Sequence, residues 1–138
     1  MKVLFVLPYL PSPPRFGGQR RLHGLMVEIA KQHEVWVATL VDPAEDTAEA
    51  LAATRAYCRR VVAVPNGRHG ALGLKKRIFQ LGSLATPVSY ENLVYRSLSL
   101  QRDLDELLAH QSFDVVQVEF SQMGVFRFPR NGAGKRPV

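Results

Sequence analysis

The residues best suited to chemistry in this sequence are two adjacent glycines, Gly17 and Gly18, with arginines on both sides. The pair follows a proline-rich segment and opens a stretch with the pattern of a helix. Glycines let a backbone approach a ligand closely, and free N–H groups at a helix start favour a phosphate. Arg15, Arg20 and Arg21 flank the pair, so the motif predicts a phosphate-bearing ligand. The alternatives are a glycine pair that only permits a left-handed turn, and solvated arginines.

A carboxylate at Asp42 raises a second possibility, a dinucleotide-binding protein. It follows an apolar run, residues 35–41, where such proteins hold ribose hydroxyls. Their fingerprint, GxGxxG, needs a short first turn, whereas the glycines here are adjacent, late and preceded by prolines. Asp42 is therefore interpreted as the cap of the following helix.

Four apolar runs predict strands, and the first is apolar throughout, as in a parallel strand covered on both faces. These runs cover residues 3–7, 35–41, 61–64 and 113–118. Helical periodicity predicts three helices between them, at residues 19–32, 44–57 and 89–110. The last is expected to start at Ser89 and to carry a core stripe of Leu93, Leu100, Leu104, Leu107 and Leu108.

Alternating strands and helices predict an α/β fold, a Rossmann-like doubly wound parallel sheet with right-handed crossovers. We expect the strand order 3-2-1-4. Ligands in such sheets bind beyond the carboxyl ends of the strands, so the Gly17-Gly18 segment and Glu119 should border one crevice. The turn-like end of the chain, residues 131–138, predicts a further strand. Residues 1–138 are thus expected to form one domain of a longer protein, cut after its fourth strand, and a naturally short protein is the alternative.

Composition narrows the class of protein further. The chain has 138 residues, 46% hydrophobic and 22% charged, which is typical of one soluble globular domain. A formal net charge of +6 indicates attraction to an anionic partner. The single cysteine, Cys58, fits a reducing, cytoplasmic setting, and no apolar run reaches the roughly 20 residues needed to span a bilayer. The histidines are scattered, so no metal site is expected.

Two segments carry a resemblance to a known family. KVLFVLPYLPSPPRFGGQRRLHGLMVEIAKQHEVWVATLV, residues 2–41, looks like the opening of family-4 retaining glycosyltransferases, which have the GT-B fold. FDVVQVEFSQMG, residues 113–124, resembles that family's later strand, which ends on the acceptor side of the cleft. Between the two segments the resemblance is only a general α/β pattern. It implies an N-terminal, acceptor-side domain that is inactive alone.

The resemblance also implies roles for the glycine motif. Gly17 and Gly18, with Arg15 beside them, are expected to face the phosphates of a nucleotide-sugar donor. A second Rossmann-like domain would hold most of that donor. Retaining enzymes of this type rely on positioning and on stabilising the leaving group, so no nucleophile and no cofactor are expected.

On the acceptor side the sequence departs from the family. Many relatives carry a histidine at the end of the later strand, where this chain has Gln117 and Glu119. Glu119 is the candidate catalytic residue, since a carboxylate in a cleft can act as a general base. A purely structural carboxylate is the alternative. The residues expected to bind the acceptor are Arg20, Glu119, Ser121 and Gln122.

A basic triplet among apolar residues predicts contact with a membrane surface. Residues 72–84 read as a helix in which Lys75, Lys76 and Arg77 lie beside Phe79, as in helices at a membrane interface. Such a surface suits an enzyme that modifies a lipid-linked acceptor and sits peripherally on the anionic inner face of the membrane. The alternative is an ordinary helix with solvated lysines.

The expected function is transfer of a sugar from a nucleotide-sugar donor to a glycan or lipid-linked acceptor, as in polysaccharide biosynthesis. The alternative is a stand-alone Rossmann-like module that binds a nucleotide or another anion. No nucleic-acid partner is expected, because the basic residues lack interleaved aromatic residues or a known binding motif.

Overall fold

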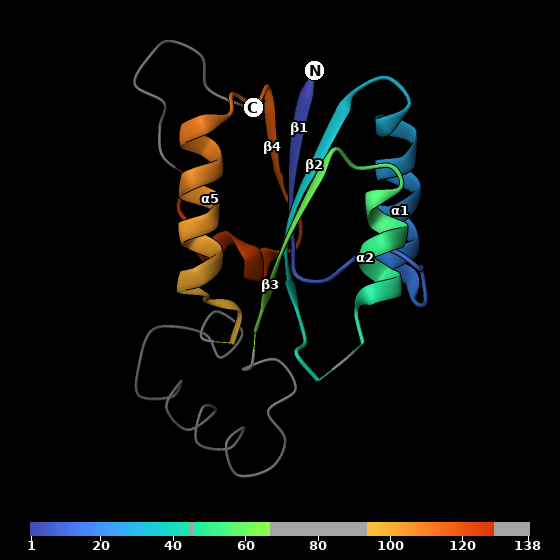
Figure 1. The fold of residues 1–138 in the computed structure, drawn as a ribbon, viewed down its shortest axis with the longest axis horizontal. Helices are drawn as coiled ribbons and strands as arrows, with labels where there is room; N and C mark the ends of the chain where they lie inside the picture. The colour runs from blue at the N-terminus through green and yellow to red at the C-terminus, as the bar shows by residue number, and fades with distance from the viewer. Residues whose placement is uncertain (45, 67–93, 129–138) are drawn as a thin grey trace.

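The structure is a computed structural model that describes residues 1–44, 46–66 and 94–128 (Figure 1). Its elements alternate along the chain as the hydrophobic pattern predicts. They are β1 (Lys2–Leu7), α1 (Gly17–Ala30), β2 (Glu34–Val41), α2 (Ala48–Arg55), β3 (Arg60–Pro65), α5 (Leu98–His110), β4 (Val115–Val118) and the 3-10 helix η1 (Ser121–Val125).

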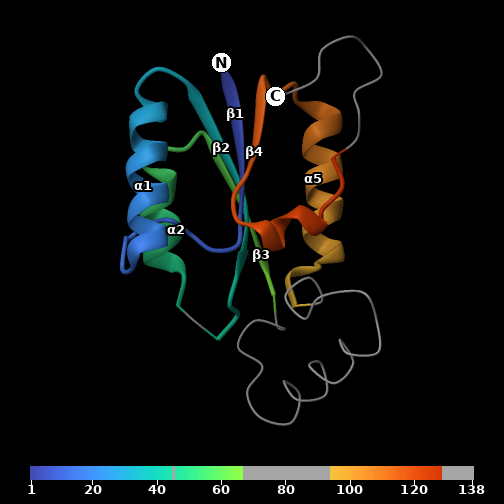
Figure 2. The same ribbon diagram turned by 180° about the vertical axis from the view of Figure 1, so that it is seen from behind.

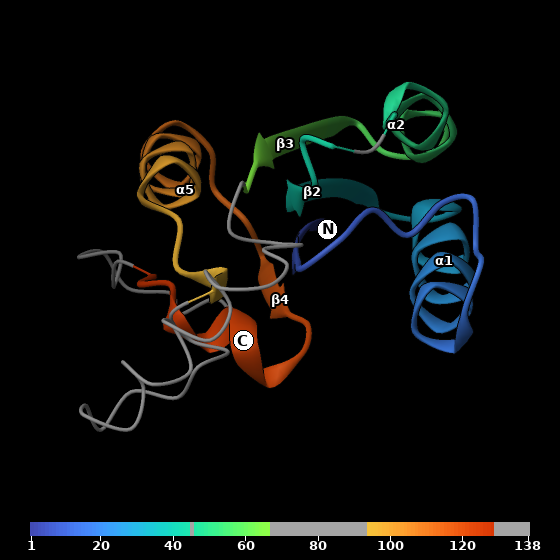
Figure 3. The ribbon, with the colours of Figure 1, turned by 90° about the horizontal axis from the view of Figure 1, so that it is seen from below.

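The four strands form one parallel sheet in the order β3-β2-β1-β4, which confirms the predicted fold class and strand order. In the middle of the sheet, Val3 of β1 lies opposite Val35 of β2 and Val115 of β4. Figure 3 shows the sheet end-on, with helices on both sides. This is the doubly wound arrangement, because parallel strands need crossovers that cover the sheet.

Each face of the sheet has its own hydrophobic core, since neighbouring side chains of a strand point to opposite faces. Val3, Phe5 and Leu7 of β1 pack on the side of α1 and α2. Leu4 and Val6 pack on the side of α5 (Figures 1 and 2). Every apolar position of β1 is therefore buried, which accounts for its unbroken hydrophobic run.

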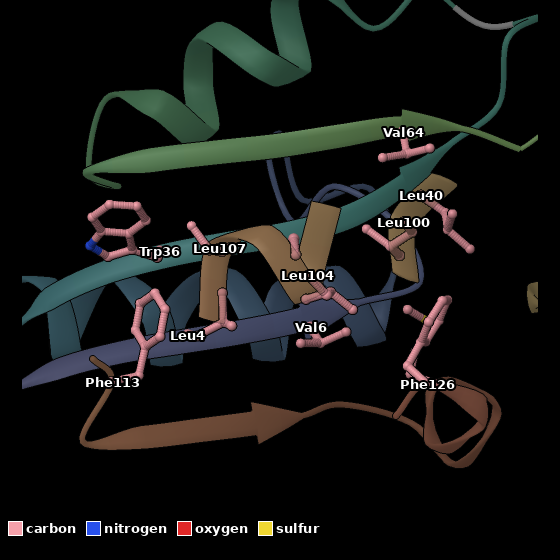
Figure 4. Close-up of a cluster of buried hydrophobic side chains, with 12 residues drawn as sticks. Leu4, Val6, Trp36, Leu40, Val64, Leu100, Leu104, Leu107, Phe113 and Phe126 are labelled. Atoms are coloured by element: carbon pink, nitrogen blue, oxygen red, sulfur yellow. The ribbon is translucent and has the colours of Figure 1, made fainter. Parts of the chain in front are cut away.

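The core under α5 anchors the segment that follows β4. Leu104 is completely buried between the helix and the sheet (Figure 4). Met123 of η1 is also completely buried in this cluster, together with Phe126. Because η1 begins two residues after Glu119, this packing fixes the direction in which the chain leaves β4.

The first two helices start at positions different from those predicted. α1 begins at Gly17 and not at residue 19, so both glycines belong to its first turn. α2 begins at Ala48, four residues later than expected. The interpretation of Asp42 as a helix cap is wrong: its Oδ1 accepts from the N–H of Ala44 at 2.9 Å and closes a turn outside the helix.

The predicted long helix at residues 89–110 is also wrong in its described part. The chain is not helical at Arg96 and Ser97, and α5 starts anew at Leu98. Ser97 caps it, because its Oγ accepts from the N–H of Leu100 at 3.2 Å. The predicted stripe is confirmed for the buried Leu100, Leu104 and Leu107 and for the partly buried Leu108, while Ser89 and Leu93 lie outside the described residues.

The strand boundaries lie closer to the predicted ones than the helix boundaries do. β2 begins one residue earlier than predicted, and β3 extends one residue further at each end. β4 begins at Val115, two residues later than expected, because Phe113 turns into the core and meets the ring of Trp36 edge-on at 5.5 Å. None of the described helices combines the length and the hydrophobicity that crossing a bilayer requires.

Candidate functional site

The site lies where the strand order changes direction. From β1 the chain continues to β2 and β3 on one side, whereas β4 lies on the other side of β1. Ligands of open α/β sheets bind at such a switch point, beyond the carboxyl ends of the two diverging strands. The loops that follow β1 and β4 meet there: the rings of Tyr9 and Phe120 lie 5.4 Å apart. We call this region the crevice.

Glu119 leaves β4 into the crevice and is buried, with 6% of its surface exposed. Its Oε2 accepts from Nη2 of Arg21 on α1, and its Oε1 accepts from Nε2 of Gln117 at 3.3 Å. The expected proximity of the glycine segment and Glu119 is thereby confirmed. A buried carboxylate needs such partners, because an unpaired charge is costly inside a protein.

Phe120 has a backbone conformation that is unfavourable for a residue with a side chain. Its φ is 70° and its ψ is 141°, and it is the non-glycine residue with positive φ in the described chain. Such conformations cost about 1–3 kcal/mol and cluster at functional sites. Here the turn points the chain from β4 into η1 and places the Phe120 ring against Tyr9.

Arg21 is a cation of α1 whose side chain lies against Glu119 and Phe120. Its side chain is 56% exposed, although one edge of the guanidinium is held by Glu119. The guanidinium also lies over the ring of Phe120, 5.8 Å from its centroid. Since a guanidinium has five N–H donors, donors remain for a ligand anion, and arginine binds phosphate well with two of them.

Arg21 flanks the glycine pair in the sequence, but the sequence alone does not assign it to the site. The signal was its spacing, because Arg21 follows Gly17 by one helical turn and so shares its face of α1. Nothing in the sequence showed that a buried carboxylate would hold it, since Glu119 lies 98 positions further along the chain.

The two glycines play different parts. Gly17 is exposed, and a Cβ there would meet no atom within 4 Å, so its backbone is open to a ligand. A Cβ on Gly18 would collide with the hydroxyl of Tyr9 and lie 3.2 Å from the ring of Phe16 and 3.4 Å from Phe120. Gly18 is therefore required for aromatic packing, whereas the backbone at Gly17 is open to solvent.

We predict that Gly18→Val lowers the free energy of unfolding by at least about 1 kcal/mol, the usual lower cost of overpacking. The added methyl groups must displace Tyr9 and Phe120. Gly17→Val on the same turn is the control and should stay within about 0.5 kcal/mol. Urea unfolding followed by circular dichroism measures both. Equal stability of the two variants would contradict the assignment of Gly18 to packing.

The remaining predicted residues are polar side chains of α1, η1 and the proline-rich loop. Arg20 is exposed on α1, Ser121 is exposed at the start of η1, and Gln122 follows it half-buried. Arg15 is exposed on the proline-rich loop, where its N–H donates to Oε1 of Gln19 at 2.8 Å. Arg15 lines a separate hollow on the other side of that loop.

This hollow, which we call the loop hollow, has a volume of about 230 Å³ and lies beyond the carboxyl ends of β1 and β2. Its walls are the proline-rich loop and the connection from β2 to α2. Its lining includes Tyr9, Phe16, Asp42, Asp46 and Ala50. Tyr9 and Phe16 belong to both regions, because they also pack around Gly18 at the crevice. No motif in the sequence predicted this hollow.

A hydrogen-bonded chain holds the proline-rich loop in place. The buried Ser12 Oγ lies 2.8 Å from Nδ1 of His23 and 2.8 Å from the hydroxyl of Tyr57. Gln19 adds a second tie, since its Nε2 donates to the carbonyl of Leu10 at 2.9 Å. The loop is therefore held against both α1 and the end of α2.

Burial sets the protonation of the nearby hydroxyls and of the thiol. Burial raises the pKa of Tyr9, although Arg21 opposes the rise, and burial also raises the pKa of Tyr57. Both are therefore neutral near pH 7 and able to donate a proton in a hydrogen bond. Burial raises the pKa of Cys58 to about 12, so it stays an unreactive thiol.

Two expectations concern features other than the crevice. Within the described ranges, no three histidine, cysteine, aspartate or glutamate residues come close enough together to hold a metal ion. The residues predicted to contact a membrane, Lys75, Lys76, Arg77 and Phe79, lie outside the described residues.

No family model, no curated protein and no solved structure matches the chain. The chain is thus identified by its architecture, a four-stranded parallel α/β sheet of Rossmann-like type.

Proposed function

We propose that the chain is the N-terminal, acceptor-side domain of a GT-B-type retaining glycosyltransferase, which transfers a sugar from a nucleotide-sugar donor to a glycan or lipid-linked acceptor. The observation that carries this proposal is Arg21, a largely exposed cation held by the buried Glu119 at the switch point. The resemblance of residues 2–41 and 113–124 to that family supports it.

In this proposal the donor's diphosphate meets Arg21 and the open backbone at Gly17. Both lie on the first turns of α1, where the helix dipole also favours negative charge. When the bond from sugar to phosphate breaks, charge develops on the leaving phosphate. A fixed arginine stabilises that charge without first having to reorganise.

Glu119 acts mainly by positioning Arg21. Both of its carboxylate oxygens already accept hydrogen bonds, from Arg21 and from Gln117. To accept a proton from an acceptor hydroxyl as a general base, it would have to share or release one of these partners. We assign the acceptor to three polar groups, the exposed Arg20 of α1, the exposed Ser121 of η1 and the half-buried Gln122.

In this proposal most of the donor site lies on another domain, so the isolated chain should lack most of the donor's binding energy. We predict that this chain alone transfers no sugar and binds nucleotide sugars only weakly, with Kd on the order of 1 mM. Arg21→Gln should weaken this residual binding, whereas Arg102→Gln, an exposed position on α5, should not. Isothermal titration with UDP-, GDP- and ADP-sugars measures both.

Micromolar or tighter binding by the isolated chain would contradict the half-site proposal. It would favour the alternative, a stand-alone module that binds a nucleotide. The gene gives an independent check, because the proposal requires a second α/β domain to be encoded after Val138.

A further inference from the structure

We propose that the loop hollow binds a second sugar ring of the acceptor, so that the acceptor is a glycan chain of at least two rings. This inference rests on the proposed function, because it extends the acceptor from the crevice across the proline-rich loop. It gives the loop hollow a ligand other than the donor phosphate that the resemblance assigns to Arg15.

The size of the hollow fits one ring. At about 230 Å³ it is smaller than the roughly 300–1,000 Å³ of sites that enclose drug-sized ligands. Its floor and sides are largely apolar, with Leu10, Leu40 and Ala50 among the lining residues. A pyranose ring has apolar C–H faces and a polar rim of hydroxyls, and so suits a hollow with an apolar floor and polar edges.

The charge of the hollow favours hydroxyl groups over phosphate. Two carboxylates, Asp42 and Asp46, line it with one cation, Arg15, in a chain whose formal net charge is +6. Asp42 accepts one hydrogen bond from the N–H of Ala44, and Asp46 accepts one from the N–H of Ala48. A carboxylate has about four acceptor sites, so capacity remains for ligand hydroxyls. A phosphate would instead be repelled by both.

Two aromatic rings join the hollow to the crevice. Tyr9 and Phe16 line the hollow, and their rings meet edge-on at 5.0 Å. Tyr9 also contacts Phe120 in the crevice, while Phe16 is 49% exposed and so presents part of its ring to solvent. A sugar chain crossing from one region to the other would pack on this exposed ring, and that continuity is why we infer several rings and not an isolated monosaccharide.

The experiment measures how binding depends on glycan length. The full chain is applied to an immobilised panel of neutral mono-, di- and trisaccharides, and the best glycan series is then titrated by NMR. We expect affinity to rise at least about tenfold from one ring to two or three, equivalent to about 1.4 kcal/mol. Signals of residues lining the loop hollow should shift only with the longer glycans.

Matched variants locate the effect. Ala50→Trp fills the hollow and should remove the gain from added rings, whereas Ala52→Trp, exposed on the same helix, should keep it. Asp42→Asn keeps an oxygen for the turn at Ala44 but removes the charge, and should weaken binding of the longer glycans. Circular dichroism confirms that each variant is folded.

Several outcomes would overturn the inference. These are retention of no glycan, equal affinity for one and three rings, full binding by Ala50→Trp, or displacement of the glycan by adenosine or uridine, which would make the hollow a nucleoside site. The results that would contradict the proposed function are different from these. Length-dependent glycan binding could persist in a two-domain protein that transfers no sugar, and transfer to a single sugar could proceed with the hollow empty.

Discussion

Leu104→Ala is expected to lower the free energy of unfolding by about 2–5 kcal/mol, the range found when a buried leucine is truncated in a core. Leu104 has 0% of its surface exposed and packs in the cluster that α5 forms with β1, β2, β3 and η1 (Figure 4). Truncation removes apolar contacts and leaves a cavity that its neighbours fill only in part. Urea unfolding followed by circular dichroism gives the free energy directly.

Leu98→Ala is the matched control, because Leu98 begins the same helix but is 75% exposed. It should change stability by no more than about 0.5 kcal/mol. The Leu104 variant should also disturb the NMR signals of Met123 and Phe126, which share its cluster and carry the segment after Glu119. A loss at Leu104 no larger than that at Leu98 would mean that α5 does not pack on the sheet as described.

The sheet could be predicted because its signal is local. Strands β1 and β2 are buried on both faces and therefore read as continuous apolar runs, and the helices between them show a helical spacing. Helix boundaries were predicted less well, since they depend on single hydrogen bonds. Asp42 and Ser97 are both good capping residues, yet Ser97 caps a helix and Asp42 closes a turn.

The candidate site could be predicted only in outline. The crevice follows from the strand order, and Glu119 follows from its place at the end of β4. The pairing of Glu119 with Arg21 depends on how α1 packs across the sheet, which no local pattern reports. No local pattern reports the part of Gly18 in aromatic packing either, because the ring of Phe120 and the hydroxyl of Tyr9 reach it from other parts of the chain.

The pairing itself predicts an unequal response to the removal of its two members. Arg21→Met should lower the free energy of unfolding by about 2–3 kcal/mol, the upper part of the range for hydrogen bonds to charged groups. The variant leaves the carboxylate of Glu119 buried without its cation. Glu119→Gln should cost less, about 1 kcal/mol, because the released arginine is already largely exposed to water.

A double-mutant cycle separates this coupling from the loss of packing. Once Glu119 is glutamine, no buried charge remains at this position, so adding Arg21→Met should cost little further. The loss of stability in the double variant should therefore be smaller than the sum of the two single losses by at least about 1 kcal/mol. Arg20→Met, exposed on the neighbouring position of α1, is the control and should add independently to Glu119→Gln. Additive costs for Arg21 and Glu119 would show that the carboxylate does not hold the arginine. The crevice would then lack the fixed cation on which the proposed donor site depends.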